Sequence, residues 1–231
     1  MVNRAILSPP DRARLIFRPI APTYERWSRW LSLGQDSRWR QTMVNKLGLT
    51  TGSEVLDVAA GTGSITRLME SHGLDVISVD QSQEMVRIAR QQGAVAVIAT
   101  AERLPFRDNT FDGVTFGYLL RYVDDVSGCL GELVRVAQPG GMMGMVEFGR
   151  PAGVWSLPWW IYTRAVLPLV GSMIGSGWRR VGRFLGPSID SFAHSYPPDL
   201  LADEWTSVGM VDVQYRSMSL GGGLVMWGRR G

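Results

Sequence analysis

The fold is decided by the stretch Glu54-Val55-Leu56-Asp57-Val58-Ala59-Ala60-Gly61-Thr62-Gly63. Its apolar run, residues 55–58, predicts a strand, and a helix-compatible run at residues 64–71 follows the glycines. Small residues and glycines between a strand and a helix let the backbone pass close to a bound ligand. We therefore expect a nucleotide-type site at this turn, with an ordinary glycine-rich turn as the alternative.

Two kinds of nucleotide ligand compete for this turn. A dinucleotide site requires the pattern G-x-G-x-x-G, and Thr66 stands where its third glycine should be. The pattern D-x-A-x-G-x-G fits S-adenosylmethionine better, because that ligand has no pyrophosphate to place on a helix N-terminus. The turn therefore predicts S-adenosylmethionine as the cofactor and assigns to its site Asp57, Ala59, Gly61, Thr62 and Gly63.

Strands and helices alternate regularly after the turn. Further strands are predicted at residues 74–79, 94–98, 111–118 and 142–148, with helices at 82–92 and 124–137 and a turn at Pro139-Gly140-Gly141. A helix at 198–208 and strands at 211–216 and 222–227 complete the chain. The last two strands form a hairpin, so the seventh runs antiparallel. The fold class is α/β: a Rossmann-like, mostly parallel seven-stranded sheet with helices on both faces.

The chain is expected to form a single domain of 231 residues with four parts. Residues 1–49 form an N-terminal arm (residues 1–22) and a helical cap, and residues 50–150 form the cofactor-binding core. Residues 151–196 form an apolar helical lid, and residues 197–231 form the C-terminal helix and hairpin.

Other cofactor contacts are expected where strands end, because ligands of such sheets lie at the carboxyl ends of the strands. Asp80 ends the second predicted strand, and its carboxylate suits two vicinal ribose hydroxyls; the alternative is that it caps the helix starting near Ser82. Residues after the third strand are placed to contact the adenine edge. The cofactor site thus also includes Asp80, Gln81, Thr100, Ala101 and Gly117.

Composition and charge exclude several classes of protein. One cysteine and two histidines provide neither a disulfide framework nor a structural zinc cluster, so no metal is predicted. Cys129 lies among apolar residues and is expected to be a buried core thiol. The segments 1–50, 51–147 and 148–231 have formal net charges of +6, −6 and +3 from their Lys, Arg, Asp and Glu content. Basic flanks around an acidic middle suggest contact with an anionic surface, with simple solubility as the alternative.

Aromatic residues gather in two flanking segments. Tyr24, Trp27, Trp30 and Leu31 share one stripe of a predicted helix, and residues 151–180 hold four of the nine tryptophans together with nearby arginines. This composition is typical of an interfacial segment or of a lid over a greasy substrate; a helix packed on the core is the alternative. The uncharged runs 151–163 and 165–178 are too short to span a bilayer. We expect a cytoplasmic protein that contacts an anionic membrane surface peripherally.

With these positions placed, the chain resembles class I S-adenosylmethionine-dependent methyltransferases and, among them, the menaquinone and ubiquinone C-methyltransferases. The similarity rests on Tyr24-Glu25, Ser32-Leu33-Gly34, Trp39, Leu56 to Gly63, Ala101 to Phe106, Arg135-Val136, Pro139-Gly140-Gly141 and Glu147-Phe148. It implies methyl transfer to a ring carbon of a lipophilic quinol such as demethylmenaquinol. It also implies that cofactor contacts come from Thr62, Asp80, Thr100, Ala101 and Gly117, with Gly61 and Gly63 shaping the turn.

The same resemblance implies that Arg121 lies beside the quinol. Ring carbon is a poor nucleophile until the neighbouring phenol loses its proton. Arginine does not normally act as a base, so we expect Arg121 to stabilise the phenolate or orient a water, with Tyr24, Glu147 or His194 as candidate partners. Arg121 and Tyr24 are the predicted catalytic residues.

The chain departs from the family pattern on the substrate side. Glu25 and Ser28 replace an Asp and an Asn, Asp36 replaces a His, Tyr122 replaces an Asn, and a Leu-Ala-Glu-Ser stretch becomes Leu185-Gly186-Pro187-Ser188. Two alternatives therefore remain: methylation of another lipophilic molecule, and a non-catalytic relative that binds cofactor or lipid. Nucleic acid is disfavoured as a substrate, because Phe116-Gly117-Tyr118-Leu119 lacks the Asn/Asp-Pro-Pro-Tyr run of amino-group methyltransferases. No feature of the sequence sets the oligomeric state.

Overall fold

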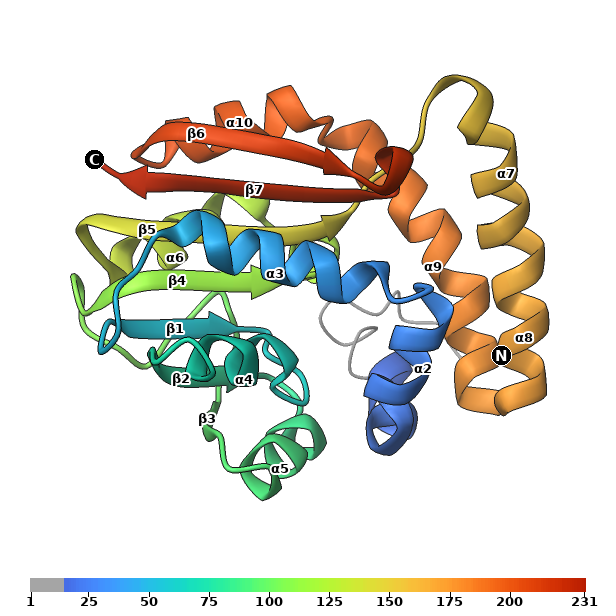
Figure 1. Cartoon of the computed structure of the whole chain (residues 1–231), viewed down its shortest axis with the longest axis horizontal. Helices are drawn as coiled ribbons and strands as arrows, with labels where there is room; N and C mark the ends of the chain where they lie inside the picture. Colours follow the sequence, from blue (N-terminus) through green and yellow to red (C-terminus); the bar gives the residue numbers. More distant parts are fainter. Residues whose placement is uncertain (1–14) are drawn as a thin grey trace, which may run out of the picture.

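A seven-stranded sheet organises the computed structural model, which describes residues 15–231 (Figure 1). The strands are β1 Glu54–Val58, β2 Asp75–Asp80, β3 Val95–Ile98, β4 Phe111–Gly117, β5 Ala137–Phe148, β6 Met210–Met218 and β7 Gly223–Arg230. Their order is β3-β2-β1-β4-β5-β7-β6, and β7 is antiparallel to both β5 and β6. The predicted α/β class and the antiparallel last strand are confirmed.

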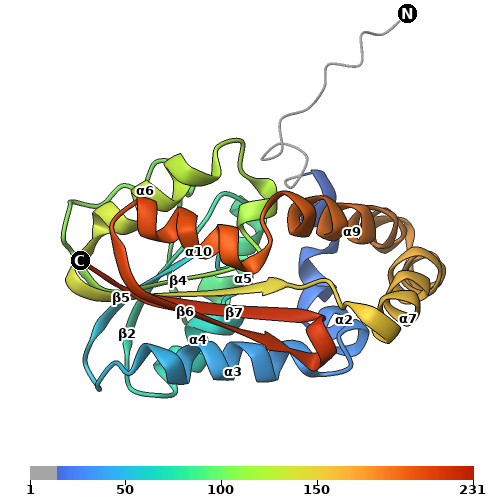
Figure 2. The same cartoon turned by 90° about the horizontal axis from the view of Figure 1, so that it is seen from above.

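Helices cover both faces of this sheet. They are α2 Tyr24–Leu31, α3 Gln35–Leu47, α4 Ser64–Glu70, α5 Gln83–Gln91, α6 Val126–Val136, α7 Ser156–Ile161, α8 Leu167–Ile174, α9 Ser176–Ser195 and α10 Pro198–Ser207. Short turns of helix occur at η1 Arg18–Thr23, η2 Leu120–Tyr122, η3 Gly153–Trp155 and η5 Ser219–Gly221, and η4 Tyr162–Val166 is a π-helical turn. Figure 2 shows α3 and α4 on one face and α6 and α10 on the other.

The core lies on both sides of the sheet, as the apolar strands require. Phe116 and Trp205 of α10 pack with their ring centroids 5.9 Å apart on the α6 and α10 face. On the other face, Trp39 and Met43 of α3 pack over β5 and β7. Cys129 is fully buried, and burial raises the pKa of its thiol to about 12, so the expectation of an inert core thiol agrees with the structure.

Strand β5 begins earlier than expected. The sequence predicts a turn at Pro139-Gly140-Gly141, but these residues belong to the strand, which starts at Ala137. Ala137 pairs with Phe111 and Met142 pairs with Gly113, so β5 contains extra residues that bulge away from β4. Proline and glycine are tolerated at such a bulge because the ladder hydrogen bonds are interrupted there.

The N-terminal segment is also more ordered than predicted. Residues 15–22 of the expected loose arm are largely helical, and Ile16 and Ile20 are buried against Trp178 and Val181 of α9. Apolar spacing of four residues puts both isoleucines on one helical face. Residues 1–14 of that arm lie outside the described residues. Trp30, predicted to share one stripe of α2 with Tyr24, Trp27 and Leu31, is 72% exposed.

The tryptophan-rich insertion is a helical hairpin. Its first arm runs through α7, the π-helical turn and α8, and α9 returns beside it (Figure 1). Pro187 lies inside α9, where it removes one backbone donor without ending the helix. The hairpin stands at the end of the sheet to which β1, β4 and β5 point, and it flanks the site described next.

Candidate active site

A cleft opens at the carboxyl ends of β1, β2 and β4, where parallel sheets place their ligands. The turn after β1 forms its floor. Gly61 and Gly63 have φ values of 59° and 85°, a left-handed conformation that disfavours side chains. This conformation takes the chain from β1 into α4 at two positions where a side chain would strain the backbone.

Asp80 is the best-defined polar group of the cleft. Its Oδ2 accepts a hydrogen bond from the Gly61 N–H at 2.8 Å, and its Oδ1 accepts one from the Ser82 N–H at 2.8 Å. Burial raises the pKa of Asp80, and these two donors oppose that rise. The side chain that caps α5 is that of Ser82, which accepts from Met85 N–H. Ser82 is therefore the N-cap residue of α5, while Asp80 accepts from the Ser82 N–H just before the helix and also lines the cleft.

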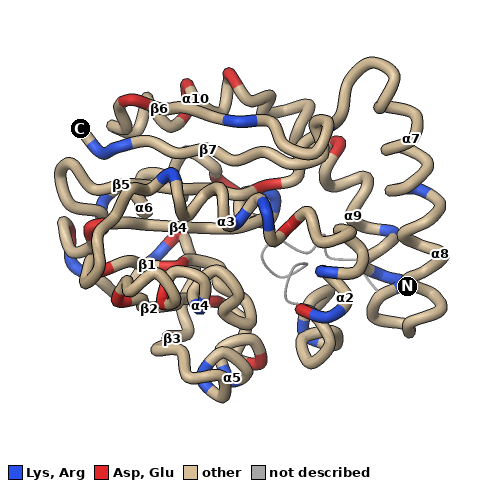
Figure 3. Tube along the Cα trace, viewed as in Figure 1, with Lys and Arg blue, Asp and Glu red and all other residues tan. Residues whose placement is uncertain are grey.

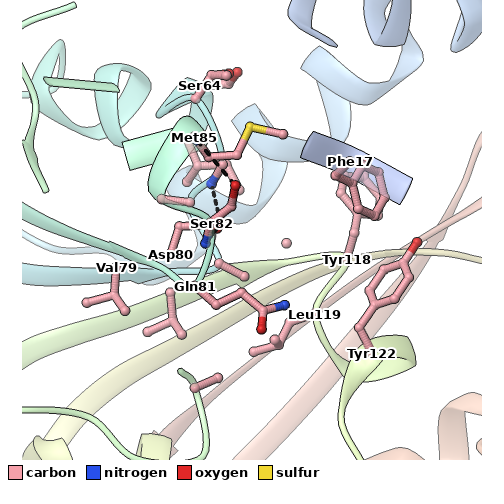
Figure 4. Close-up of a pocket in the computed structure, with 18 of the residues that line it drawn as sticks. Phe17, Ser64, Val79, Asp80, Gln81, Ser82, Met85, Tyr118, Leu119 and Tyr122 are labelled. Atoms are coloured by element: carbon pink, nitrogen blue, oxygen red, sulfur yellow. Dashed lines mark hydrogen bonds between the residues drawn. The ribbon is translucent and has the colours of Figure 1, made fainter. Parts of the chain in front are cut away.

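Most of the predicted cofactor residues line this cleft together. Figure 4 shows Asp80, Gln81 and Ser82 on one side of the pocket and the aromatic side chains of Phe17, Tyr118 and Tyr122 on the other. Of the ten predicted positions, seven line the cleft: Ala59, Gly61, Thr62, Asp80, Gln81, Ala101 and Gly117. Asp57, Gly63 and Thr100 do not line it, although each is next in sequence to a residue that does.

Asp57 lies behind the turn. It is fully buried, with Thr66 donating to Oδ2 at 2.7 Å and Thr115 donating to Oδ1 at 3.0 Å. Burial raises the pKa of Asp57 from its ordinary value of 3.8 to about 6, against the opposing effect of the two threonine donors. Its position indicates a role in holding the turn, and direct cofactor contact by Asp57 stays a prediction.

A second, largely apolar cavity adjoins the cleft and lies under the helical hairpin. Trp159, Tyr162, Leu167 and Ile189 line it from the hairpin, and Trp39 and Phe148 line it from α3 and β5. Residues that line both spaces mark the junction between them: Phe17, Tyr24, Arg40, Tyr118 and Tyr122. We call the first space the cofactor cleft and the second the acceptor cavity.

Arg121 lines the acceptor cavity but not the cofactor cleft. Its Nε donates to Glu147 Oε1 at 2.9 Å, and the two side chains are only 2% and 1% exposed. Burial raises the pKa of Glu147 and Arg121 opposes that rise. Its other oxygen, Oε2, is buried and has no hydrogen-bond partner among residues 15–231. Of the three candidate partners, Glu147 is the one in contact; His194 is exposed near the end of α9.

Tyr24 stands at the junction. Its ring stacks on Trp178 with centroids 6.4 Å apart and meets Phe17 edge-on at 5.9 Å. Burial raises the pKa of Tyr24 above its ordinary value, with Arg40 opposing the rise. The hydroxyl therefore stays protonated at neutral pH and is available as a donor.

The next residue, Glu25, ties the cap to the cofactor turn. Its Oε1 accepts hydrogen bonds from Thr62 at 2.9 Å, from Ser64 at 2.8 Å and from Arg67. Burial opposes the ionisation of Glu25, but these donors outweigh it and lower the pKa below its ordinary value. Glu25 is conspicuous in the sequence only as a replacement for an Asp, and its partners lie 37 to 42 residues away.

A third polar group at the junction has no counterpart among the predicted site residues. Asp36 and Arg40 of α3 form an ion pair, with Nε to Oδ1 at 2.9 Å and Nη2 to Oδ2 at 2.6 Å. Tyr118, which follows β4, donates its hydroxyl to the same Oδ1. The i, i+4 spacing of Asp36 and Arg40 is visible in the sequence, but such pairs are common on exposed helices. Only the fold shows that this pair is buried.

The cofactor cleft suits S-adenosylmethionine on its own geometry. A half-buried carboxylate, Asp80, lines the cleft with lone pairs left over for a ribose diol. In the same cleft Ala59 adopts a left-handed φ of 56°, and a Cβ on Gly117 would come within 3.0 Å of Ile65 Cδ1, so a glycine fits there without crowding. Apolar walls from Leu119 and Val123 suit an adenine or thioether group.

Comparison with known proteins agrees with this geometry. Residues 8–229 match the model of the ubiE/COQ5 methyltransferase family. The chain is 36% identical over 230 residues to the ubiquinone/menaquinone biosynthesis C-methyltransferase UbiE of Desulfotalea psychrophila, covering 96% of this chain and 92% of that protein. It is 36% identical over 219 residues to the demethylmenaquinone methyltransferase of Renibacterium salmoninarum, covering 94% and 90%.

Solved structures support the fold. The S-adenosylmethionine-dependent methyltransferase of Thermotoga maritima superposes with a TM-score of 0.65 at 19% identity, covering 94% of this chain and 99% of that one. At this level of identity the match concerns the architecture of the sheet and its helices. It adds no information on the acceptor.

Proposed function

The chain belongs to the ubiE/COQ5 methyltransferase family, and we propose that it methylates a ring carbon of a lipophilic quinol such as demethylmenaquinol. S-adenosylmethionine supplies the methyl group when it is bound. The observation that carries this proposal is the junction, where Tyr24, Tyr118 and Tyr122 line both the cofactor cleft and the acceptor cavity. A methyl donor and an apolar acceptor held in these two spaces would meet there.

The acceptor cavity fits an aromatic, lipophilic molecule. Its walls are mainly aromatic and aliphatic side chains, including Trp39, Phe148, Trp159 and Leu167. Few polar groups face it, and these few are suited to fix the orientation of a ring hydroxyl. Exclusion of water by the hairpin strengthens each of those polar contacts.

Arg121 supports ionisation of the ring hydroxyl. Its guanidinium is held by Glu147 and by Ser188, whose Oγ accepts from Nη1 at 3.3 Å, and it lies 5.4 Å from the centre of the Phe148 ring. A fixed cation in an apolar cavity stabilises a phenolate without having to reorganise. Glu147 Oε2, which has no hydrogen-bond partner within residues 15–231, is able to accept from a water that Arg121 orients.

Cofactor contact by Asp57, Ala59, Gly61, Thr62, Gly63, Asp80, Gln81, Thr100, Ala101 and Gly117 belongs to the same proposal. Asp80 is the strongest support for this site, because two backbone donors fix its carboxylate at the edge of the cleft. Tyr24 contributes a protonated hydroxyl at the junction. The N-terminal cap, the core, the hairpin and the C-terminal elements act as one domain, since each of them lines one of the two spaces or supports the sheet.

The first test is methyl transfer itself. The protein is incubated with methyl-labelled S-adenosylmethionine and demethylmenaquinol, and the product ring is analysed for label. Label in the ring supports the proposal. Label only in other lipophilic phenols would replace the quinol by another acceptor, and cofactor binding without any transfer would favour a non-catalytic relative. Those alternatives have a structural basis, because the unusual residues Ser28, Asp36 and Tyr122 all line the acceptor cavity.

We further propose that the hairpin rests on an anionic membrane surface, from which a lipophilic acceptor enters. No helix among residues 15–231 is long and apolar enough to cross a membrane. The first arm of the hairpin has almost no charged position, as Figure 3 shows. Large apolar side chains on it and on the preceding turn η3 are exposed: Val154, Leu157, Trp160, Leu169 and Met173. Trp155 is 48% exposed and also lines the acceptor cavity, so the exposed patch continues into that cavity.

Basic residues accompany this patch. Arg179, Arg180 and Arg183 are exposed near the start of α9, beside the end of α8. Apolar anchors next to arginines are the composition that binds anionic bilayers.

Vesicle binding tests the membrane proposal. Leu157→Glu combined with Trp160→Glu should abolish co-sedimentation with phosphatidylglycerol vesicles, and Val95→Glu should not. Val95 is the matched control, because it is 62% exposed on the edge strand β3, away from the hairpin. Equal binding by both variants would refute the membrane proposal and leave the transfer reaction unaffected.

A further inference from the structure

The Asp36–Arg40 ion pair reaches the junction of the two spaces through Arg40. Arg40 lines both the cofactor cleft and the acceptor cavity, whereas Arg121 lines only the second. Asp36 lines the acceptor cavity, and the side chains of Arg40 and Asp36 are 12% and 9% exposed. We expect a hydroxyl next to the methylated carbon to lie near this pair.

Tyr118 connects the pair to the junction. Its hydroxyl donates to Asp36 Oδ1, so its oxygen remains able to accept a proton from a ligand. Tyr118 holds a φ of 57°, a left-handed conformation that costs a non-glycine residue about 1–3 kcal/mol and is often found at functional sites. Figure 4 shows Tyr118 on the far side of the cleft from Asp80.

We propose that Asp36 is the proton acceptor for the ring hydroxyl of the methyl acceptor, with Tyr118 as the relay. This inference rests on the proposed quinol methylation and names a base for it. The acceptor hydroxyl gives its proton to Tyr118 Oη, and Tyr118 gives its own proton to Asp36 Oδ1. The products are a phenolate, an unchanged Tyr118 hydroxyl and a neutral Asp36 carboxylic acid.

Charge balance favours this arrangement. Before the transfer, Arg40 is neutralised by Asp36; after it, Arg40 is neutralised by the phenolate. The negative charge moves from one oxygen to another beside the same guanidinium, so the apolar cavity gains no net charge. Two anions beside a single guanidinium would repel each other, so the carboxylate and the phenolate are expected to share one proton.

The other charged and titratable groups around the Asp36–Arg40 pair are tyrosines and Arg121. Tyr24 of α2 and Tyr122 of η2 lie in the same junction, and burial raises the pKa of Tyr24, Tyr118 and Tyr122 alike. Arg121 forms an ion pair with Glu147. Asp36 is thus the one carboxylate among the residues that line the acceptor cavity within the described chain.

The first experiment needs no turnover. An acidic nitronaphthol, ionised in solution at about pH 8, is bound to the protein in the presence of S-adenosylhomocysteine and followed by calorimetry in buffers of different ionisation enthalpy. The wild type should take up about one proton on binding, because Asp36 becomes protonated, while the absorbance band of the naphtholate is retained. Asp36→Asn should take up none. Absence of uptake by the wild type, or equal uptake by Asp36→Asn, would overturn the proposal.

Kinetics provide the second readout. Asp36→Asn should lower kcat by about 10²- to 10⁴-fold with little change in KM, and the loss should shrink for more acidic acceptors, which need less help to ionise. Tyr118→Phe leaves the Asp36–Arg40 pair in place and should show the same dependence on acceptor acidity. A uniform loss across acceptors, or a change confined to KM, would make Asp36 structural.

Matched controls separate these outcomes from misfolding. Asp212→Asn makes the same chemical change at the exposed Asp212–Arg229 pair and should leave kcat and proton uptake unchanged. Normal affinity for S-adenosylhomocysteine shows that each variant is folded. If the wild type methylates no quinol, the proposed function fails, but the proton-uptake experiment still decides whether Asp36 accepts the proton.

Discussion

Asp57 is a buried carboxylate beneath the cofactor turn, and its charge should oppose folding at neutral pH. Burial raises the pKa of Asp57 to about 6 in the folded protein, against an ordinary value of 3.8. At pH 7 the carboxylate is ionised in both the folded and the unfolded states. The folded protein then bears a burial penalty of about 3 kcal/mol, from roughly two pKa units at 1.36 kcal/mol each.

The sign of the pH dependence follows from the raised pKa. As the pH falls through 6, the folded protein binds a proton at Asp57 before the unfolded chain does, so this group adds stability. Integration of the two titrations gives about 2 kcal/mol of added stability between pH 7 and about pH 4.5. Asp57→Asn has no such proton. The free energy of unfolding of the variant minus that of the wild type should therefore fall by about 2 kcal/mol over this range.

Urea unfolding of both proteins at the two pH values measures this difference. All other titrating groups are shared, so their contributions largely cancel in the comparison. Asparagine can accept from only one of the donors Thr66 and Thr115, which shifts the variant's stability by a constant amount at every pH. A difference between the two proteins that does not change with pH would refute the reasoning.

Three further predictions concern the cofactor site and the core. Asp80→Ala should weaken binding of S-adenosylhomocysteine by at least about 100-fold in calorimetry, and normal affinity would remove Asp80 from the site. Glu25→Gln loses the charged acceptor of three hydrogen bonds and should speed cofactor dissociation by about 10-fold in stopped flow; an unchanged rate would mean that the cap does not restrain the ligand. Gly223→Ala would place a Cβ 2.4 Å from Trp39 Cε2 and should lower the free energy of unfolding by about 1–3 kcal/mol. Gly131→Ala, which meets only open space, is its control, and equal destabilisation of both would contradict the packing argument.

Local sequence patterns were sufficient for the sheet and the cofactor cleft. The strand-turn-helix unit from Glu54 to Glu70 is contiguous in the chain, and Asp80 follows at the end of the next strand. Parallel strands bring their carboxyl ends to one edge, so residues at those ends converge whatever the rest of the chain does. The predicted start of β5 was wrong. A proline and two glycines indicated a turn there, but in the structure they lie in a bulge of the strand.

The substrate side depended on tertiary structure. The Asp36–Tyr118 contact spans 82 residues and the Glu25–Thr62 contact spans 37. No periodic pattern or motif in the sequence predicts either contact. Nor does sequence show that Glu147, rather than His194, faces Arg121. The physical reason is that a strand or helix is set by neighbours along the chain, whereas a buried ion pair is set by which helix packs on which strand. The sequence alone thus determined the turn from Asp57 to Gly63 and its cofactor, and only the tertiary structure decided which charges surround the acceptor.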